Sequence, residues 1–189
     1  MCSPKAMSWI ILPLVLGFFL GSIVVRTQID VASGVTTVNG GGATGRALVV
    51  YHPGLSSFHA DVMSAFVDGL AERDWRCDLT TASRTAPAGL EGYDLLVLGA
   101  PTYAWKPASS IVRYVDRLGD LGGIPTVVLL TSAGPNTEVV AAFGQSVEAA
   151  NGRVVLALEV RQIAPNEEIH GVSDAIEIAR CAGAELALP

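Results

Sequence analysis

Residues 94–130 read DLLVLGAPTYAWKPASSIVRYVDRLGDLGGIPTVVLL, and this stretch decides the fold class. It begins and ends with short apolar runs, Asp94–Gly99 and Pro125–Leu130, in which polar and apolar residues do not alternate. Such runs are typical of strands buried on both faces of a parallel sheet. The segment between them carries an apolar stripe at helical spacing, formed by Ile111, Val112, Val115 and Leu118. The stretch therefore predicts a strand, a helix and a second strand parallel to the first.

The same alternation continues on both sides of this stretch. Apolar runs predict two further strands, at Ala47–Tyr51 and Arg153–Val160, and Arg76–Thr81 has a weaker strand pattern. Amphipathic segments predict the remaining helices, which are Phe58–Glu72, a segment with Val139, Val140, Phe143 and Val147, and Val172–Leu186. Alternating strands and helices predict an α/β fold, a doubly wound three-layer sandwich around a parallel sheet. Its five strands are expected in the order 2-1-3-4-5.

The composition excludes several classes of protein. Half of the 189 residues are hydrophobic, which excludes a disordered chain, and the net charge of −6 argues against nucleic-acid binding. Three cysteines, Cys2, Cys77 and Cys181, lie far apart in the sequence. Neither a disulfide scaffold nor a cysteine zinc site is therefore expected, and the thiols suit a reducing compartment or are simply unused.

An uncharged segment, SWIILPLVLGFFLGSIVV, occupies Ser8–Val25. As a helix it would span about 27 Å, close to the hydrocarbon thickness of a bilayer. Residues 1–26 are therefore predicted to be a single-pass transmembrane anchor. A cleaved signal peptide and a buried core helix are the alternatives, but no convincing cleavage site follows this segment. Lys5 and Arg26 flank it evenly, so the charges leave its orientation open.

Residues 27–45 (TQIDVASGVTTVNGGGATG) are rich in glycine, serine and threonine, which predicts a flexible linker. Residues 46–189 then form one predicted domain. The sequence has no G-x-S-x-G nucleophile motif, no Walker phosphate loop and no HExxH zinc motif. No catalytic residue and no metal ligand is therefore predicted.

The doubly wound order predicts where a ligand binds. Ligands of such sheets lie beyond the carboxyl ends of the strands, where the strand order reverses. That rule selects the loops His52–His59, Pro101–Lys106 and Thr131–Pro135. The first loop leads into a helix, whose free N–H groups and dipole attract an anion such as phosphate. Ser56 or Ser57 could equally be an ordinary helix cap.

The other two loops have the composition of walls around a flat ligand. Tyr103 and Trp105 follow the end of a strand, where core packing does not require aromatic residues, so they can stack on a ring system. The alternative is that Trp105 packs over Pro107 and staples its own loop. The third loop, TSAGP, is small enough for backbone contact with a ligand edge, although an ordinary turn has the same composition.

Taken together, the loops resemble those of the flavodoxin family. The most specific match is Gly99–Leu118 (GAPTYAWKPASSIVRYVDRL), which is similar to the family's third strand end, its flavin-facing loop with a tyrosine and the following helix. TSAG at Thr131–Gly134 is similar in kind to the family's third loop. The family's phosphate loop is T-x-T-G-x-T, and on Gly54–His59 only Ser56 is a conservative match. Ser57 and His59 stand where the family has glycine and threonine.

The resemblance implies a domain that binds FMN noncovalently and transfers electrons, as a carrier or as a small NAD(P)H- or quinone-linked reductase. It implies cofactor-binding residues in all three loops: Gly54, Ser56, Ser57, His59, Pro101, Thr102, Tyr103, Trp105, Thr131, Ser132, Ala133 and Gly134.

The expected partners are the membrane, a redox partner protein and a membrane quinone. FMN supply and reduced cysteines favour a domain on the cytoplasmic side. The alternative is a flavin-free module of the same fold that binds another ligand or a protein at the membrane, because a fold does not fix a function.

Overall fold

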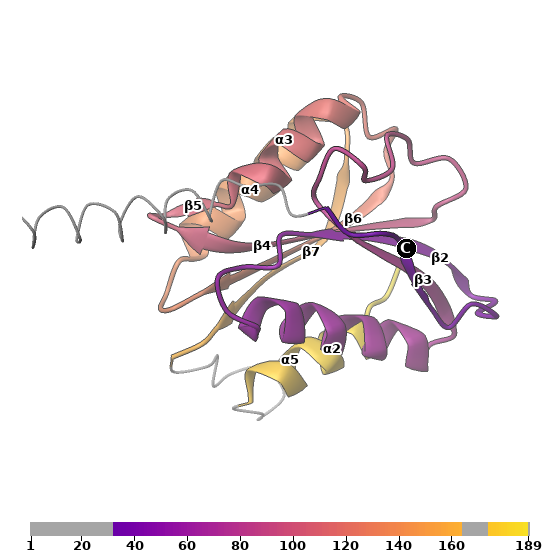
Figure 1. Ribbon diagram of the computed structural model, residues 1–189, viewed down its shortest axis with the longest axis horizontal. Coiled ribbons are helices and arrows are strands. Elements are labelled where there is room, and N and C mark those ends of the chain that lie inside the picture. Colours follow the sequence, from indigo (N-terminus) through magenta and orange to yellow (C-terminus); the bar gives the residue numbers. More distant parts are fainter. Residues whose placement is uncertain (1–31, 164–173, 189) are drawn as a thin grey trace, which may run out of the picture.

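The computed structural model describes residues 32–163 and 174–188. Five parallel strands form the centre of the molecule, in the spatial order β3-β2-β4-β6-β7 (Figure 1). Their bounds are Gly45–Tyr51 for β2, Trp75–Thr81 for β3, Leu95–Tyr103 for β4, Pro125–Ser132 for β6 and Arg153–Arg161 for β7. This order is 2-1-3-4-5 in chain order, so the α/β class and the strand order predicted from the sequence are confirmed.

Helices cover both faces of the sheet (Figure 1). On one face lie α2 (Phe58–Glu72) and α5 (Ala175–Ala184), and on the other lie α3 (Ser109–Leu118) and α4 (Thr137–Ala149). The central strands send alternate side chains into two separate cores. On β2, for example, Ala47 and Val49 belong to the core beneath α2, whereas Leu48 and Val50 belong to the core beneath α3.

Two short strands were not predicted, and both pair in the antiparallel direction. β1 (Thr36–Val38) pairs with the outer edge of β3, and the Thr37 hydroxyl donates a hydrogen bond to Asp78 at 2.6 Å. The prediction of a flexible linker over 27–45 is therefore wrong for this part. The open edge of β3 offers unpaired backbone groups, and a three-residue strand is too short to show periodicity in the sequence. The second addition, β5 (Lys106–Pro107), pairs with the end of β4.

The predicted anchor at Ser8–Val25 lies outside the described residues. Within 32–163 and 174–188, no helix has both the length and the apolar character needed to cross a bilayer.

Candidate functional site

The three loops selected from the sequence meet at the carboxyl edge of the sheet, around a cavity of about 270 Å³. The lining residues come from the loop after β2, the end of β4 and the end of β6, with one residue from the segment after β7. The lining residues are Gly54, Leu55, Ser56, Phe58, His59, Pro101, Thr102, Tyr103, Thr131, Ser132, Ala133 and Gln162. A second depression of about 380 Å³ adjoins the first and shares Thr102, Ser132 and Ala133 with it.

The loop after β2 presents the amino end of α2 to the cavity. Ser57 is the N-cap of this helix, but its side chain makes no capping hydrogen bond. Ser57 therefore occupies the cap position considered as the alternative, but it does not cap the helix through its side chain. Gly54 has a φ of 87°, a conformation that favours glycine, and it lets the chain turn tightly before the helix. The first turn of α2 thus keeps N–H groups that no side chain caps, as an anion site requires.

His59 belongs to this first turn, and only 2% of its surface is exposed. Its Nδ1 atom is 2.9 Å from the Thr131 hydroxyl, which ties the first loop to the end of β6. Burial lowers the pKa of His59 to about 3, with a smaller contribution from His52, so the imidazole is neutral at pH 7. Its Nε2 atom is buried without a hydrogen-bond partner in the structure. Such an atom in a cavity wall is suited to a polar ligand.

The loop after β4 is a tight hairpin rather than an open loop. β5 pairs with the end of β4, and the two residues at the turn, Ala104 and Trp105, have φ values of 47° and 58°. A left-handed conformation at a non-glycine residue is strained by about 1–2 kcal/mol. This turn places the Trp105 side chain at the tip of the hairpin, where it is 78% exposed and lines the second depression. With that exposure Trp105 is not the loop staple considered as the alternative.

Tyr103 stands at the base of the same hairpin. Its ring meets that of His52 edge-on, with centroids 6.3 Å apart. Burial raises the pKa of Tyr103, against a smaller lowering by the backbone of Leu55. By hydrogen-bond geometry its hydroxyl, like Nε2 of His59, is buried without a partner among the described residues. Two residues that line the cavity from different loops thus each have a buried polar atom without a hydrogen-bond partner in the described part of the chain.

The third loop contributes mainly backbone to the site. The Thr102 hydroxyl donates to the Thr131 carbonyl at 3.1 Å, which holds the second and third loops together. The Ser132 hydroxyl lies 2.7 Å from a carboxylate oxygen of the buried Glu159 and 2.6 Å from the carbonyl of Gly134. These side chains are engaged within the protein, so the surface left for a ligand is the backbone around Ala133.

The structure brings together all but one of the predicted site residues. Trp105 and Gly134 line the second depression and the others line the first cavity, but the exposed Ser57 lines neither. Six further residues line the two depressions and were not among the site residues predicted from the sequence: Leu55, Phe58, Ala104, Pro135, Asn136 and Gln162. Gln162 follows the last strand directly, so the rule that selected the other loops could have found it.

Comparison with known proteins identifies the fold. No family model and no curated protein matches the chain. Among solved structures, a flavodoxin from the domain Archaea aligns with a TM-score of 0.59 at 13% identity, over 75% of this chain and 95% of that one. A flavodoxin of Streptococcus pneumoniae TIGR4 also gives 0.59, at 16% identity over 75% and 97%. The NAD(P)H:quinone oxidoreductase of Methanothermobacter marburgensis gives 0.52, at 16% identity over 78% and 98%. The fold is therefore flavodoxin-like.

Proposed function

We propose that this chain binds FMN noncovalently between its three carboxyl-edge loops and transfers electrons through it. The observation that carries the proposal is the pair of buried, unpartnered polar atoms, Nε2 of His59 and the hydroxyl of Tyr103, in one cavity next to the exposed Trp105. Polar atoms that lack partners and an exposed aromatic ring together suit a flat, polar ligand with an anionic arm. The flavin supplies the redox chemistry when bound.

Each loop has its own proposed part in binding. The uncapped turn of α2, with Ser56 and Ser57 beside it, would hold the phosphate, and the neutral His59 would offer it a hydrogen bond without adding charge. Tyr103 and Trp105 would cover the ring and limit the access of water to it. The backbone of Thr131–Gly134 would face the polar edge of the ring. Similarity in fold to flavodoxins and to an NAD(P)H:quinone oxidoreductase supports a redox role, with a partner protein or a quinone as acceptor.

The test is the visible absorption spectrum of the purified full chain, before and after FMN is added, followed by gel filtration. We expect flavin bands that stay with the protein. Riboflavin, which lacks the phosphate, is the matched control and should bind at least about tenfold more weakly, since it cannot use the amino end of α2. A colourless protein that ignores FMN would contradict the proposal and leave a flavin-free binding module as the better account.

We further propose that Ser8–Val25 anchors the domain to a membrane, with the domain on the cytoplasmic side. The support is the uncharged apolar stretch itself, which is long enough to span the hydrocarbon layer. We expect the full chain to remain in the membrane fraction after an alkaline carbonate wash, and a variant without residues 1–31 to be released. A mature mass that lacks this segment would instead identify a cleaved signal peptide.

A further inference from the structure

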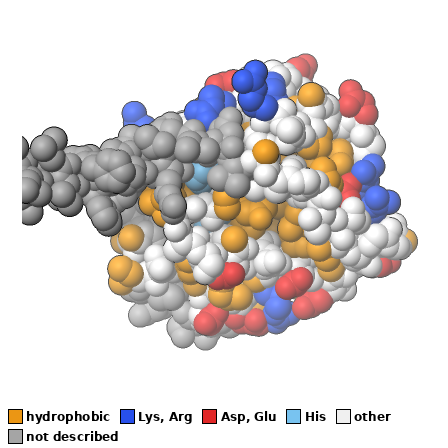
Figure 2. All heavy atoms as spheres, viewed as in Figure 1, with side chains coloured by type: hydrophobic (Ala, Val, Ile, Leu, Met, Phe, Trp, Pro, Cys, Tyr) orange, Lys and Arg blue, Asp and Glu red, His pale blue; other side chains and the backbone are white. Residues whose placement is uncertain are grey.

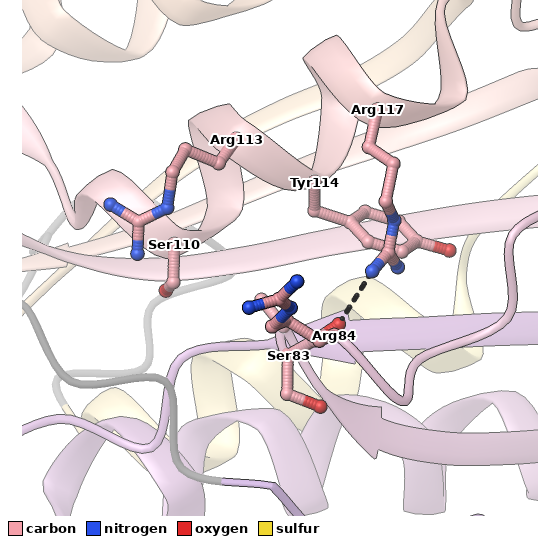
Figure 3. Close-up of a pocket in the computed structure, with 7 residues that line it drawn as sticks. Ser83, Arg84, Ser110, Arg113, Tyr114 and Arg117 are labelled. Carbon is pink, nitrogen blue, oxygen red and sulfur yellow. Dashed lines mark hydrogen bonds between the residues drawn. The ribbon is translucent and has the colours of Figure 1, made fainter.

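A further cavity, of about 320 Å³ and separate from the two at the carboxyl edge of the sheet, lies between α3 and the loop that follows β3. Its lining is dominated by arginine: Arg84 comes from the loop, and Arg113 and Arg117 come from α3 (Figure 3). Hydroxyl groups complete the wall, from Ser83, Ser110 and Tyr114. None of these residues lines the two depressions assigned above to the flavin.

The charges of Arg84 and Arg117 are not balanced by an ion pair within the described part of the chain. Arg113 and Arg117 are one helical turn apart, a spacing at which like charges repel each other. Among residues 32–163 and 174–188, no carboxylate forms an ion pair with Arg84 or Arg117. Figure 2 shows basic side chains at the upper edge of the molecule with acidic side chains beside them, and further acidic side chains along the lower edge. A local positive site in a chain of net charge −6 needs a separate explanation.

The pocket is also held in shape before any ligand arrives. The two terminal nitrogens of Arg117 donate to the carbonyls of Ser83 and Ala86, at 2.9 and 3.0 Å, which fixes the loop against α3. At the other end the buried Ser110 hydroxyl lies 3.0 Å from Nδ1 of His52. In Figure 3 the guanidinium group of Arg84 lies between those of Arg113 and Arg117. The Ser83 hydroxyl lies 2.9 Å from that of Thr85, and the Tyr114 hydroxyl donates to the Pro87 carbonyl at 3.0 Å, so the guanidinium groups are the part of the lining that a ligand would contact.

We propose that this pocket binds a phosphate group carried by a small molecule. Guanidinium groups form paired, charge-assisted hydrogen bonds with phosphate oxygens, and a dianion would offset the repulsion among three arginines. An apolar ligand would gain little from such a lining. The phosphate could belong to a pyridine nucleotide or to a smaller ester, and both sources share this chemistry. The proposal is independent of whether the chain binds FMN.

The test is calorimetric titration of the full chain at low salt with inorganic phosphate, NADP⁺ and NAD⁺. Arg84→Gln and Arg113→Gln are combined in one variant, because both side chains are exposed and Arg117 is left to hold the loop. We expect this double substitution to raise the Kd for phosphate at least about tenfold, because it removes two charge-assisted contacts. Arg153→Gln, at an exposed arginine outside the pocket, is the matched control and should leave Kd within about twofold.

Two results would overturn the proposal. One is that none of the three probes binds the wild-type chain at millimolar concentration. The other is binding that survives the double substitution, which would place the anion elsewhere, for example at the amino end of α2. If the arginine-dependent binding is much tighter for NADP⁺ than for NAD⁺, the source is the extra phosphate of the nucleotide. If inorganic phosphate binds as tightly as NADP⁺, the source is a smaller phosphate compound. Either of these two results supports the proposal that the arginine pocket binds a phosphate group.

Discussion

Replacement of Gly69 by alanine is expected to destabilise the domain by about 2–3 kcal/mol, although alanine is the better helix former. Gly69 lies in α2 where this helix crosses α5. A Cβ atom at this position would be 2.0 Å from the carbonyl oxygen of Arg180 and 2.7 Å from the amide nitrogen of Ala184. Both atoms belong to the backbone of α5, so no side-chain rotation can relieve the overlap. The helices would have to separate.

Gly144 provides a matched control within the same protein. It is also a glycine in the middle of a helix, α4, but a Cβ atom there would meet no heavy atom within 4 Å. Gly144→Ala should therefore stabilise the domain by about 0.5–1 kcal/mol. Urea unfolding followed by circular dichroism measures both changes. Opposite signs are the expected result, and equal stabilities for the two variants would show that α2 and α5 do not approach this closely.

This helix contact illustrates what the sequence could and could not reveal. The apolar stripe of Phe58–Glu72 predicted the helix and its buried face correctly, because periodicity reports which residues leave water. Periodicity does not report which neighbour covers them. Gly69 was therefore indistinguishable in sequence from Gly144, although an added Cβ atom would overlap the backbone of α5 at Gly69 and would meet no described atom within 4 Å at Gly144.

The candidate site was predictable for a different reason. Parallel strands all end at one edge of the sheet, so strand order alone brought Gly54, Tyr103 and Thr131 together. What each side chain does there depends on contacts between distant segments. Thr131 is occupied by His59, which lies 72 residues away in the chain, and no local pattern encodes that hydrogen bond.

The arginine pocket was missed for a similar reason. Arg113 and Arg117 lie on the exposed face of an amphipathic helix, where charged residues are the normal expectation. Their significance depends on Arg84, which the loop after β3 carries to the same place. The turn at Ala104 and Trp105 was also hidden, since neither residue type favours a left-handed conformation.

Trp105→Ala is expected to weaken FMN binding by about 5- to 150-fold, which corresponds to the 1–3 kcal/mol that stacking on one aromatic side chain contributes. Trp105 lies at the tip of the hairpin with 78% of its surface exposed, so it contributes little to the core. The same substitution should therefore change the free energy of unfolding by no more than about 0.5 kcal/mol. A strained, exposed tryptophan that the fold does not need is best explained by a ligand.

Fluorescence titration with FMN measures this effect, and Val35→Ala is the matched control. Val35 is another exposed apolar residue, 51% accessible, and it lines neither depression of the candidate site. We expect the control to bind FMN like the wild type. If the wild type binds FMN and Trp105→Ala binds it equally well, the ring does not stack on this hairpin, and Tyr103 alone would have to cover it. If the wild type itself fails to bind, the proposed function is wrong, so the two failures are distinguishable.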